Sequence, residues 1–283
     1  MEKGAPLTKV CVADTVVQAC LAHALTTEQE EVMGVLLGEV TVHHATTPAV
    51  AAASPTSSHT GTAAARQTLH KRANVWGSWI LQRSVRRSDR VEIAPEMLAS
   101  ATEEADRCTE DIGCPTRVIG WYHSHPRITP YPSQVDLRSQ ETYQMLESGW
   151  VGLIFSVFYS DMSNRNAVSM HCFQTGPGGT HEKIDVEVVP VSKMPVRALP
   201  PCDVTHRLLH IFRAEVRAAV ELVRQRCKGA PDAMAAAFAL QEVQLYTLEK
   251  LIAQPALRQL RLSISLMERE VRRLEEELSA LPS

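Results

Sequence analysis

The chain has 283 residues, enough for one large domain or for a domain with an appended region. Its hydrophobic content of 45% is ordinary for a globular protein, and its formal net charge of −3 offers no electrostatic basis for binding nucleic acid. The longest apolar run, WVGLIF at 150–155, is far too short to span a bilayer. We therefore expect neither nucleic acid nor a membrane among the partners of this chain.

The N-terminal apolar stretch at 10–25 is interrupted by Asp14 and His23. It is typical of an amphipathic helix rather than of a signal peptide. The seven cysteines form no CxxC pair, and without a secretory signal they are expected to be reduced thiols. This use of cysteine predicts a protein of the cytoplasm and nucleus.

Helical and strand patterns alternate from residue 1 to about 195, which indicates an α/β domain. In chain order we expect a helix at 10–25, strands at 31–40 and 74–82, a helix at 94–112, a strand at 116–125, a helix at 133–147, and strands at 150–159, 167–173 and 183–191. Between the first two strands lies 43–65, rich in Ala, Thr, Ser and Pro. Such a composition buries too little surface to offset its ordering entropy, which predicts a mobile insert.

Strand patterns stop after 195–201, and three helices are expected in the region 202–283: at 203–228, at 232–254 and after Pro255. Apolar residues of the last helix alternate in steps of three and four, an unbroken a/d heptad pattern. The pattern predicts a coiled-coil assembly region, with packing on the chain's own helices as the alternative. The seam consists of Leu257, Leu260, Ile264, Met267, Val271, Leu274, Leu278 and Leu281.

The segment GWYHSHPRITPYPSQVD at 120–136 carries the strongest chemical signal. His123 and His125 are two residues apart on a strand, so both side chains point to the same face. Ser133 suits the N-cap of the following helix, and Asp136 then falls in its first turn. Two histidines and one aspartate are the ligand number of a catalytic zinc site that keeps its fourth position for water.

A simpler alternative is a capped helix that follows a polar strand, and each half of the pattern alone favours it. The joint spacing His-x-His-x7-Ser-x2-Asp, however, is expected by chance on the order of once in a thousand for this composition. The strand–loop–helix context is also the one that ligation requires. We therefore predict one Zn²⁺ per chain, held by His123, His125 and Asp136.

This spacing resembles the JAMM motif of the MPN+ family, the JAB1/MPN/Mov34-type metalloproteases, which are mostly isopeptidases that remove ubiquitin or its relatives. The resemblance implies an MPN domain over 1–195, with a curved, mixed and mostly antiparallel sheet flanked by helices. It also implies zinc ligation by the two histidines and the aspartate.

The family also places a glutamate at the start of an earlier strand in a Glu-x-x-Gly setting, which Glu31 and Gly34 match here. The resemblance implies that Glu31 deprotonates the zinc water and passes the proton to the leaving lysine amine. It implies that the Ser133 hydroxyl helps to stabilise the oxyanion. Taken alone, Glu31 would be a solvated strand-end charge beside Glu28 and Glu30.

Two residues of the loop before the helix, Thr129 and Tyr131, lie where family enzymes hold the substrate. Contact with ubiquitin and simple loop packing are equal alternatives for them. Trp121 or Tyr122 alternates with the histidines and is expected in the core.

Stretches between about 26 and 173 further resemble the deubiquitinase subunits of BRISC and Abraxas-type complexes, which cut lysine-63-linked ubiquitin chains. The resemblance is weak over the insert 43–65. The resemblance implies ubiquitin chains as substrate, an MPN-minus scaffold of the Abraxas type as partner, and activity only when paired. A non-catalytic MPN scaffold and an isopeptidase for a ubiquitin-like modifier remain alternatives.

The charges beside the coiled-coil seam bear on the choice of partner. A parallel homodimer would bring acidic e and g positions together across the seam, whereas a partner with basic flanks would pair with them. The acidic residues are Glu268, Glu270, Glu275 and Glu277, against one basic residue, Arg261.

Overall fold

The computed structural model describes residues 5–47, 66–81, 93, 95–160, 166–196, 204–226, 230–247, 249–250 and 254–280. The chain divides into two compact units, residues 1–201 and 202–283.

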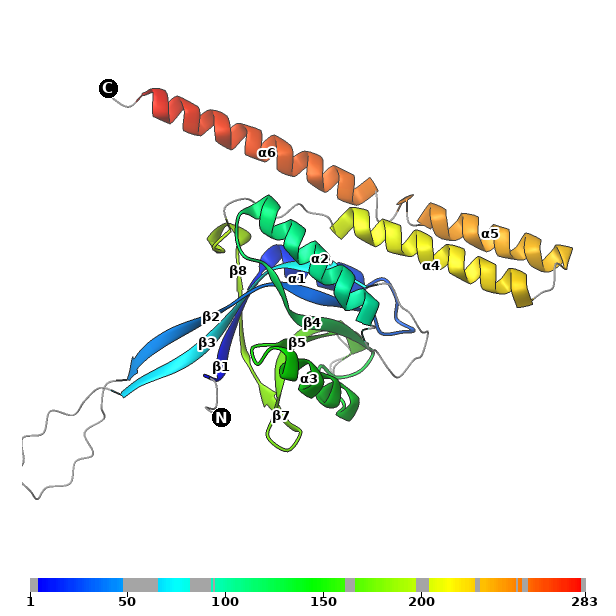
Figure 1. Ribbon diagram of the computed structural model, residues 1–283. Helices are drawn as coiled ribbons and strands as arrows, with labels where there is room; N and C mark the ends of the chain where they lie inside the picture. The colour runs from blue at the N-terminus through cyan, green and yellow to red at the C-terminus, as the bar shows by residue number, and fades with distance from the viewer. Residues whose placement is uncertain are drawn as a thin grey trace, which may run out of the picture. The chain divides into compact units, whose positions relative to one another are not determined.

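An eight-stranded sheet in the order β7-β6-β5-β4-β2-β3-β1-β8 forms the centre of the first unit (Figure 1). Pairs β4–β5, β3–β1 and β1–β8 are parallel, and the other neighbours are antiparallel. The predicted mixed, mostly antiparallel sheet is therefore confirmed. The strands are β1 Leu7–Ala13, β2 Met33–Thr47, β3 Arg66–Ile80, β4 Arg117–Pro126, β5 Val151–Ser160, β6 Asn166–Gly176, β7 Thr180–Lys183 and β8 Asp185–Val189.

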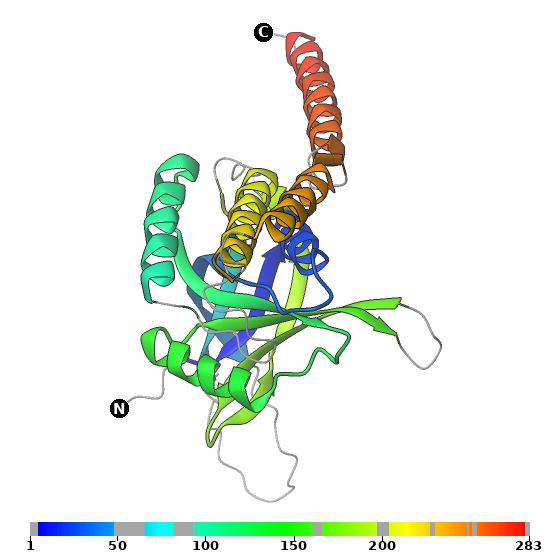
Figure 2. The same cartoon turned by 90° about the vertical axis from the view of Figure 1, so that its right-hand side faces the viewer.

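Helices cover both faces of the sheet. Helix α1 (Asp14–Ala24) packs Val16 and Cys20 into one buried cluster, which includes Tyr122 of β4. Helices α2 (Pro95–Ile112) and α3 (Gln134–Leu146) pack into the other cluster, which includes Trp121 of β4. Figure 2 shows α2 and α3 on one side of the sheet and α1 on the other. Alternation along β4 thus sends neighbouring aromatic rings into two different cores.

The N-terminal expectation was wrong in one respect. The stretch 10–25 is not a single helix, because Leu7–Ala13 forms strand β1 and the helix begins only at Asp14. Strand β1 is inserted between β3 and β8 and is almost fully buried over its last four residues. A strand buried on both faces is continuously apolar, so its sequence merges with the apolar stripe of the helix that follows.

The predicted mobile insert also begins too early. Residues 43–47 are the end of β2, and they pair in antiparallel register with the start of β3, Thr47 opposite Arg66. Residues 48–65 lie outside the described residues. The strand expected at 183–191 is β8, and a short strand that was not expected, β7, lies at the opposite end of the sheet. A short three-residue helix, Val191–Lys193, follows β8.

The second unit consists of α4 (Val204–Arg226), α5 (Pro231–Thr247) and α6 (Gln254–Ser279), with α4 and α5 packed together. None of the helices in the described ranges is both long and apolar enough to cross a bilayer. In α6 six predicted seam residues are exposed, namely Leu257, Ile264, Met267, Val271, Leu274 and Leu278. Leu281 and the side chain of Leu260 lie outside the description, and the coiled coil stays a prediction.

Candidate metal centre

Strand β4 carries the two histidines in the middle of the sheet, between β2 and β5. His123 is fully buried and His125 is only 2% exposed, so neither side chain lies on the protein surface. The register pairs Met33 of β2 with His123, and pairs Ile154 and Ser156 of β5 with the two histidines. Central strands on both sides therefore fix the backbone that carries the rings.

Asp136 reaches the same place from the first turn of α3. Ser133 is the N-cap: its Oγ accepts a hydrogen bond from the Asp136 N–H at 3.2 Å, and its own N–H donates to Asp136 Oδ2 at 2.7 Å. This reciprocal capping box both starts the helix and fixes the aspartate carboxylate. The predicted N-cap and first-turn positions are therefore those in the structure.

Buried Gln140 fixes α3 to the sheet. Its Oε1 accepts from Trp121 Nε1 at 2.8 Å, and its Nε2 donates to the Trp150 carbonyl at 2.8 Å and to Gln144 Oε1 at 2.9 Å. Both ends of the buried amide are thus satisfied. Because Trp121 is two residues before His123 on β4, this network joins the helix that carries Asp136 to the strand that carries the histidines.

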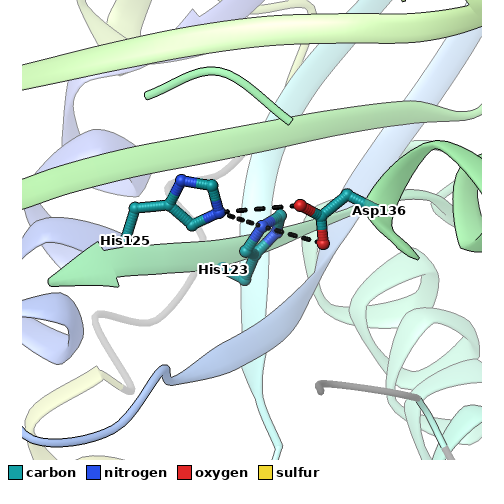
Figure 3. A group of neighbouring side chains, drawn as sticks. All are labelled: His123, His125 and Asp136. Atoms are coloured by element: carbon teal, nitrogen blue, oxygen red, sulfur yellow. Dashed lines mark hydrogen bonds and ion pairs between the residues drawn. The ribbon is translucent and has the colours of Figure 1, made fainter. Parts of the chain in front are cut away.

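The three side chains converge on one point, as Figure 3 shows. His123 Nε2 lies 3.1 Å from His125 Nε2 and 3.4 Å from Asp136 Oδ1, and His125 Nε2 lies 3.6 Å from Asp136 Oδ2. A tetrahedral zinc centre with these ligand types has donor–donor separations of about 3.3 Å. The three buried groups are therefore spaced to hold a metal ion. Within the described residues, they form a cluster of potential metal ligands.

Each imidazole ring is also oriented by a contact with a residue outside the three-residue cluster. His125 Nδ1 is 2.7 Å from the backbone oxygen of Thr129, which selects the tautomer with Nδ1 protonated and leaves Nε2 as the ligand atom. The ring of His123 stacks on Trp121, with centroids 4.6 Å apart and planes 19° apart. Thr129 thus orients a histidine through its backbone, a role that the sequence did not indicate.

The charges in the centre are strongly coupled. Burial by itself would raise the pKa of Asp136, but hydrogen bonds from His123 and His125 hold it well below its ordinary value. Burial likewise opposes protonation of His125, yet the contacts with Asp136, Thr129 and Glu31 raise its pKa above the ordinary value. Asp136 is therefore held as a carboxylate anion, the form that binds a cation.

Glu31 lies just before β2, and its Oε1 is 4.0 Å from His125 Nε2. Gly34, three residues later, is opposite Tyr122 of β4. A Cβ at Gly34 would lie 2.4 Å from Tyr122 Cε1 and 2.6 Å from the Trp79 carbonyl oxygen. A residue with a side chain would not fit at position 34, which explains why a glycine follows Glu31 at this spacing. The pairing of β2 with β4 also brings Glu31 beside the three-residue cluster.

Tyr131 projects from the loop between the histidines and α3 and is 62% exposed. Its ring lies edge-on to His171 of β6 and His181 of β7, at centroid distances of 5.4 and 6.3 Å. The two histidines approach through their Nε2 atoms at 2.7 Å. Burial and the neighbouring charges of His181 and Lys183 lower the pKa of His171 to about 4, so it is neutral at pH 7.

The sequence did not indicate this histidine pair. His171 aligns with His123 across the sheet, because both pair with Ile154 of β5. That relation depends on strand order, and no local spacing in the chain reveals it.

A mixed sheet flanked by helices, with two histidines on a central strand and an aspartate at the next helix, defines an MPN domain. A family model described as JAB1/Mov34/MPN/PAD-1 ubiquitin protease matches residues 5–149, which include both histidines and the aspartate. The chain belongs to this family, as the JAMM-type spacing predicted.

Curated proteins similar to this chain include several named Lys-63-specific deubiquitinase BRCC36. The one from Xenopus tropicalis is 38% identical over 218 residues, 76% of this chain and 67% of that protein. The one from Homo sapiens is 45% identical over 157 residues, 55% of this chain and 49% of that protein. The matches thus span between about half and two thirds of the relatives' own length.

Proposed function

We propose that this chain is a zinc-dependent deubiquitinase that hydrolyses isopeptide bonds in lysine-63-linked ubiquitin chains. The observation that carries the proposal is the buried convergence of His123, His125 and Asp136 at separations suited to zinc, with Glu31 beside them. The identity of 38–45% with proteins named as Lys-63-specific deubiquitinases supports the substrate.

His123, His125 and Asp136 would hold the ion through two nitrogens and one carboxylate oxygen. When bound, zinc supplies the Lewis acidity that activates water and polarises a carbonyl at neutral pH. Glu31 accepts the proton of the attacking water and then delivers it to the lysine amine that leaves. Ser133 can cap α3 and still act on substrate, because a hydroxyl that accepts a bond retains its own hydrogen to donate to the oxyanion.

The loop of Thr129 and Tyr131 is the proposed contact for the polypeptide around the scissile bond. Tyr131 offers an exposed aromatic ring that is backed by two histidines, an arrangement suited to holding an extended chain with little loss of side-chain entropy. Thr129 already uses its backbone oxygen to orient His125, so its side chain is the part left for substrate.

We further propose a partner, an MPN-minus scaffold of the Abraxas type that binds through the MPN domain and α6. The exposed apolar seam of α6 supports this proposal, because such patches usually mark an interface. The cytoplasm and nucleus are the proposed location, and the free thiols Cys11, Cys20, Cys108, Cys114 and Cys172 are consistent with those reducing compartments.

The decisive experiment measures metal content and cleavage together. The full chain, coexpressed with a candidate scaffold, should contain about one zinc per copy and cut lysine-63-linked diubiquitin in preference to a panel of other linkages. Asp136→Ala should lose both metal and cleavage while remaining folded by circular dichroism. Zinc without cleavage of any chain would favour a scaffold, and wild-type cleavage by Asp136→Ala would exclude this centre.

A further inference from the structure

Ser124, the residue between the two histidines, makes an unusual contact with β2. Its side chain is fully buried and points to the face opposite the metal centre. Its Oγ accepts a hydrogen bond from the Val32 N–H at 2.9 Å, and its own N–H donates to the Val32 carbonyl, also at 2.9 Å. Val32 directly follows Glu31.

This arrangement departs from a regular antiparallel ladder. Since Met33 pairs with His123, Val32 is opposite Ser124, and two such residues would ordinarily exchange both bonds through backbone carbonyls. Here a hydroxyl replaces one of the carbonyls as acceptor. Strand β2 accordingly begins at Met33, and Val32, the neighbour of Glu31, is held by one backbone bond and one side-chain bond from Ser124.

We propose that Ser124 is a positioning residue for Glu31 and sets the distance of its carboxylate from the metal-binding histidines. The inference rests on the function proposed above. His123, Ser124 and His125 then have linked roles: the two histidines are the proposed ligands, and Ser124 holds the segment of the proposed base, Glu31. Because the three residues are consecutive on β4, the position of the base is linked to the positions of the ligands through a short stretch of backbone. The 4.0 Å separation of Glu31 Oε1 from His125 Nε2 is the distance that this anchor would control.

A second contact holds the same segment but is weaker. Glu28 forms an ion pair with Arg127 at 2.6 Å, and both side chains are well exposed to solvent. Exposed pairs of this kind contribute little and are screened by salt. The buried bonds between Ser124 and Val32, one residue from Glu31, are therefore the stronger of these two contacts, and we expect them to help position the carboxylate.

Replacement of Ser124 tests the proposal on the full chain coexpressed with its scaffold. Ser124→Ala removes the acceptor, and we expect kcat for lysine-63-linked diubiquitin to fall on the order of 10- to 100-fold, because small displacements of a catalytic group have effects of this size. KM and zinc content should stay unchanged. Ser124→Thr keeps the hydroxyl and should restore most of the turnover.

Thr116→Val is the matched control. Thr116 is buried just before β4, and its Oγ1 accepts from Trp76 Nε1 at 3.1 Å, far along the strand from the histidines. This variant also leaves a buried N–H without an acceptor, so it should lower the melting temperature as Ser124→Ala does. Its kcat should be that of the wild type, which separates positioning from stability.

A double-mutant cycle with Glu31→Gln completes the test. If Ser124 acts through Glu31, Ser124→Ala should cause no further loss in the Glu31→Gln background. An equal loss in both backgrounds, loss of zinc from Ser124→Ala, or wild-type kcat in that variant would each overturn the inference. Full activity of Glu31→Gln would instead show that the proposed base is wrong, and the inference would fail with it.

Discussion

Each residue of the metal centre is fixed by a different kind of contact. The backbone oxygen of Thr129 orients His125, ring stacking on Trp121 orients His123, and a capping box orients Asp136. All three contacts are made by the protein itself, and they favour the positions from which the donor atoms can bind an ion. Such preorganisation lowers the ordering cost of binding an ion and makes the supporting residues part of its affinity.

Glu31 should be essential for turnover but not for metal. Glu31→Gln keeps the shape of the side chain and removes its basicity, so we expect kcat to fall on the order of 10²–10⁴-fold. Zinc measured by atomic absorption should remain at the wild-type level, because Glu31 lies outside the cluster of three ligands. Loss of zinc from this variant would make Glu31 a ligand and refute its assignment as a base.

Tyr131 should affect binding more than chemistry. Tyr131→Ala removes an exposed ring backed by His171 and His181, and loss of an aromatic anchor of this kind should raise KM for diubiquitin about tenfold. Its kcat and zinc content should change little, as expected when the same contact is lost from ground state and transition state. Tyr131→Phe keeps the ring and serves as the control; an unchanged KM in Tyr131→Ala would leave the ring a packing residue.

The arrangement of the centre could be predicted to the extent that it is local in sequence. His123, His125, Ser133 and Asp136 lie within one strand–loop–helix segment, where side-chain alternation and helix capping determine which groups meet. Glu31 reaches the site only through the pairing of β2 with β4, and spacing alone could not establish that pairing. A resemblance to known proteins was therefore needed to single it out.

At the scale of elements, β2 and β4 can lie this close together because Gly34 has no side chain. Gly34→Ala would place a methyl group 2.4 Å from Tyr122 Cε1 and 2.6 Å from the Trp79 carbonyl oxygen. Tyr122 is fully buried and cannot move aside freely. We expect a loss of about 1–3 kcal/mol in the free energy of unfolding, measured by denaturant titration, together with reduced activity because Glu31 would shift.

Gly77→Ala on β3 is the control for this prediction. The added Cβ would lie 3.2 Å from Leu37 Cβ, a tight contact but one with a side chain instead of a backbone oxygen. It should cost clearly less stability and leave turnover near the wild-type value. Equal effects of the two substitutions would mean that the close contacts at Gly34 are not the cause, and that replacing any glycine of these strands is equally destabilising.

Two errors in the expected elements have a common physical cause. Strand β1 and the end of β2 gain their stability from neighbours that are distant in the chain: β1 pairs with β3 and β8, and residues 43–47 pair with the start of β3. A polar sequence such as HHATT carries no strong local signal for a strand. Helices α2, α3 and α4, whose hydrogen bonds are local, agree with expectation to within two residues, whereas α5 ends at Thr247 instead of 254.

At the scale of the whole molecule, α6 exposes two different sets of apolar residues. The a/d seam includes Leu274 and Leu278, while Leu262 and Leu266 lie off the seam and are also exposed. Arg273 forms ion pairs with Glu270 at 2.5 Å and with Glu277 at 2.6 Å. Part of the acidic flank is thus compensated within the helix itself, which reduces the repulsion expected for a parallel homodimer and leaves the apolar seam as the stronger argument for a second chain.

The seam should therefore be required for assembly, and its position on the helix can be tested. Leu274→Asp combined with Leu278→Asp puts two charges into the proposed interface, and we expect it to weaken the complex with an MPN-minus scaffold, measured by size-exclusion chromatography with light scattering. Cleavage of lysine-63-linked chains should fall with assembly, while zinc content stays the same because the centre lies in the other unit.

The matched control makes the same substitutions off the seam. Leu262→Asp with Leu266→Asp adds the same charge to the same exposed helix, so it should leave the complex and its activity intact if only the a/d face is buried by a partner. Equal weakening by both pairs would point to loss of the helix instead of loss of an interface. Undiminished assembly after deletion of 255–283, or full activity of the isolated monomer, would contradict the role of α6 altogether.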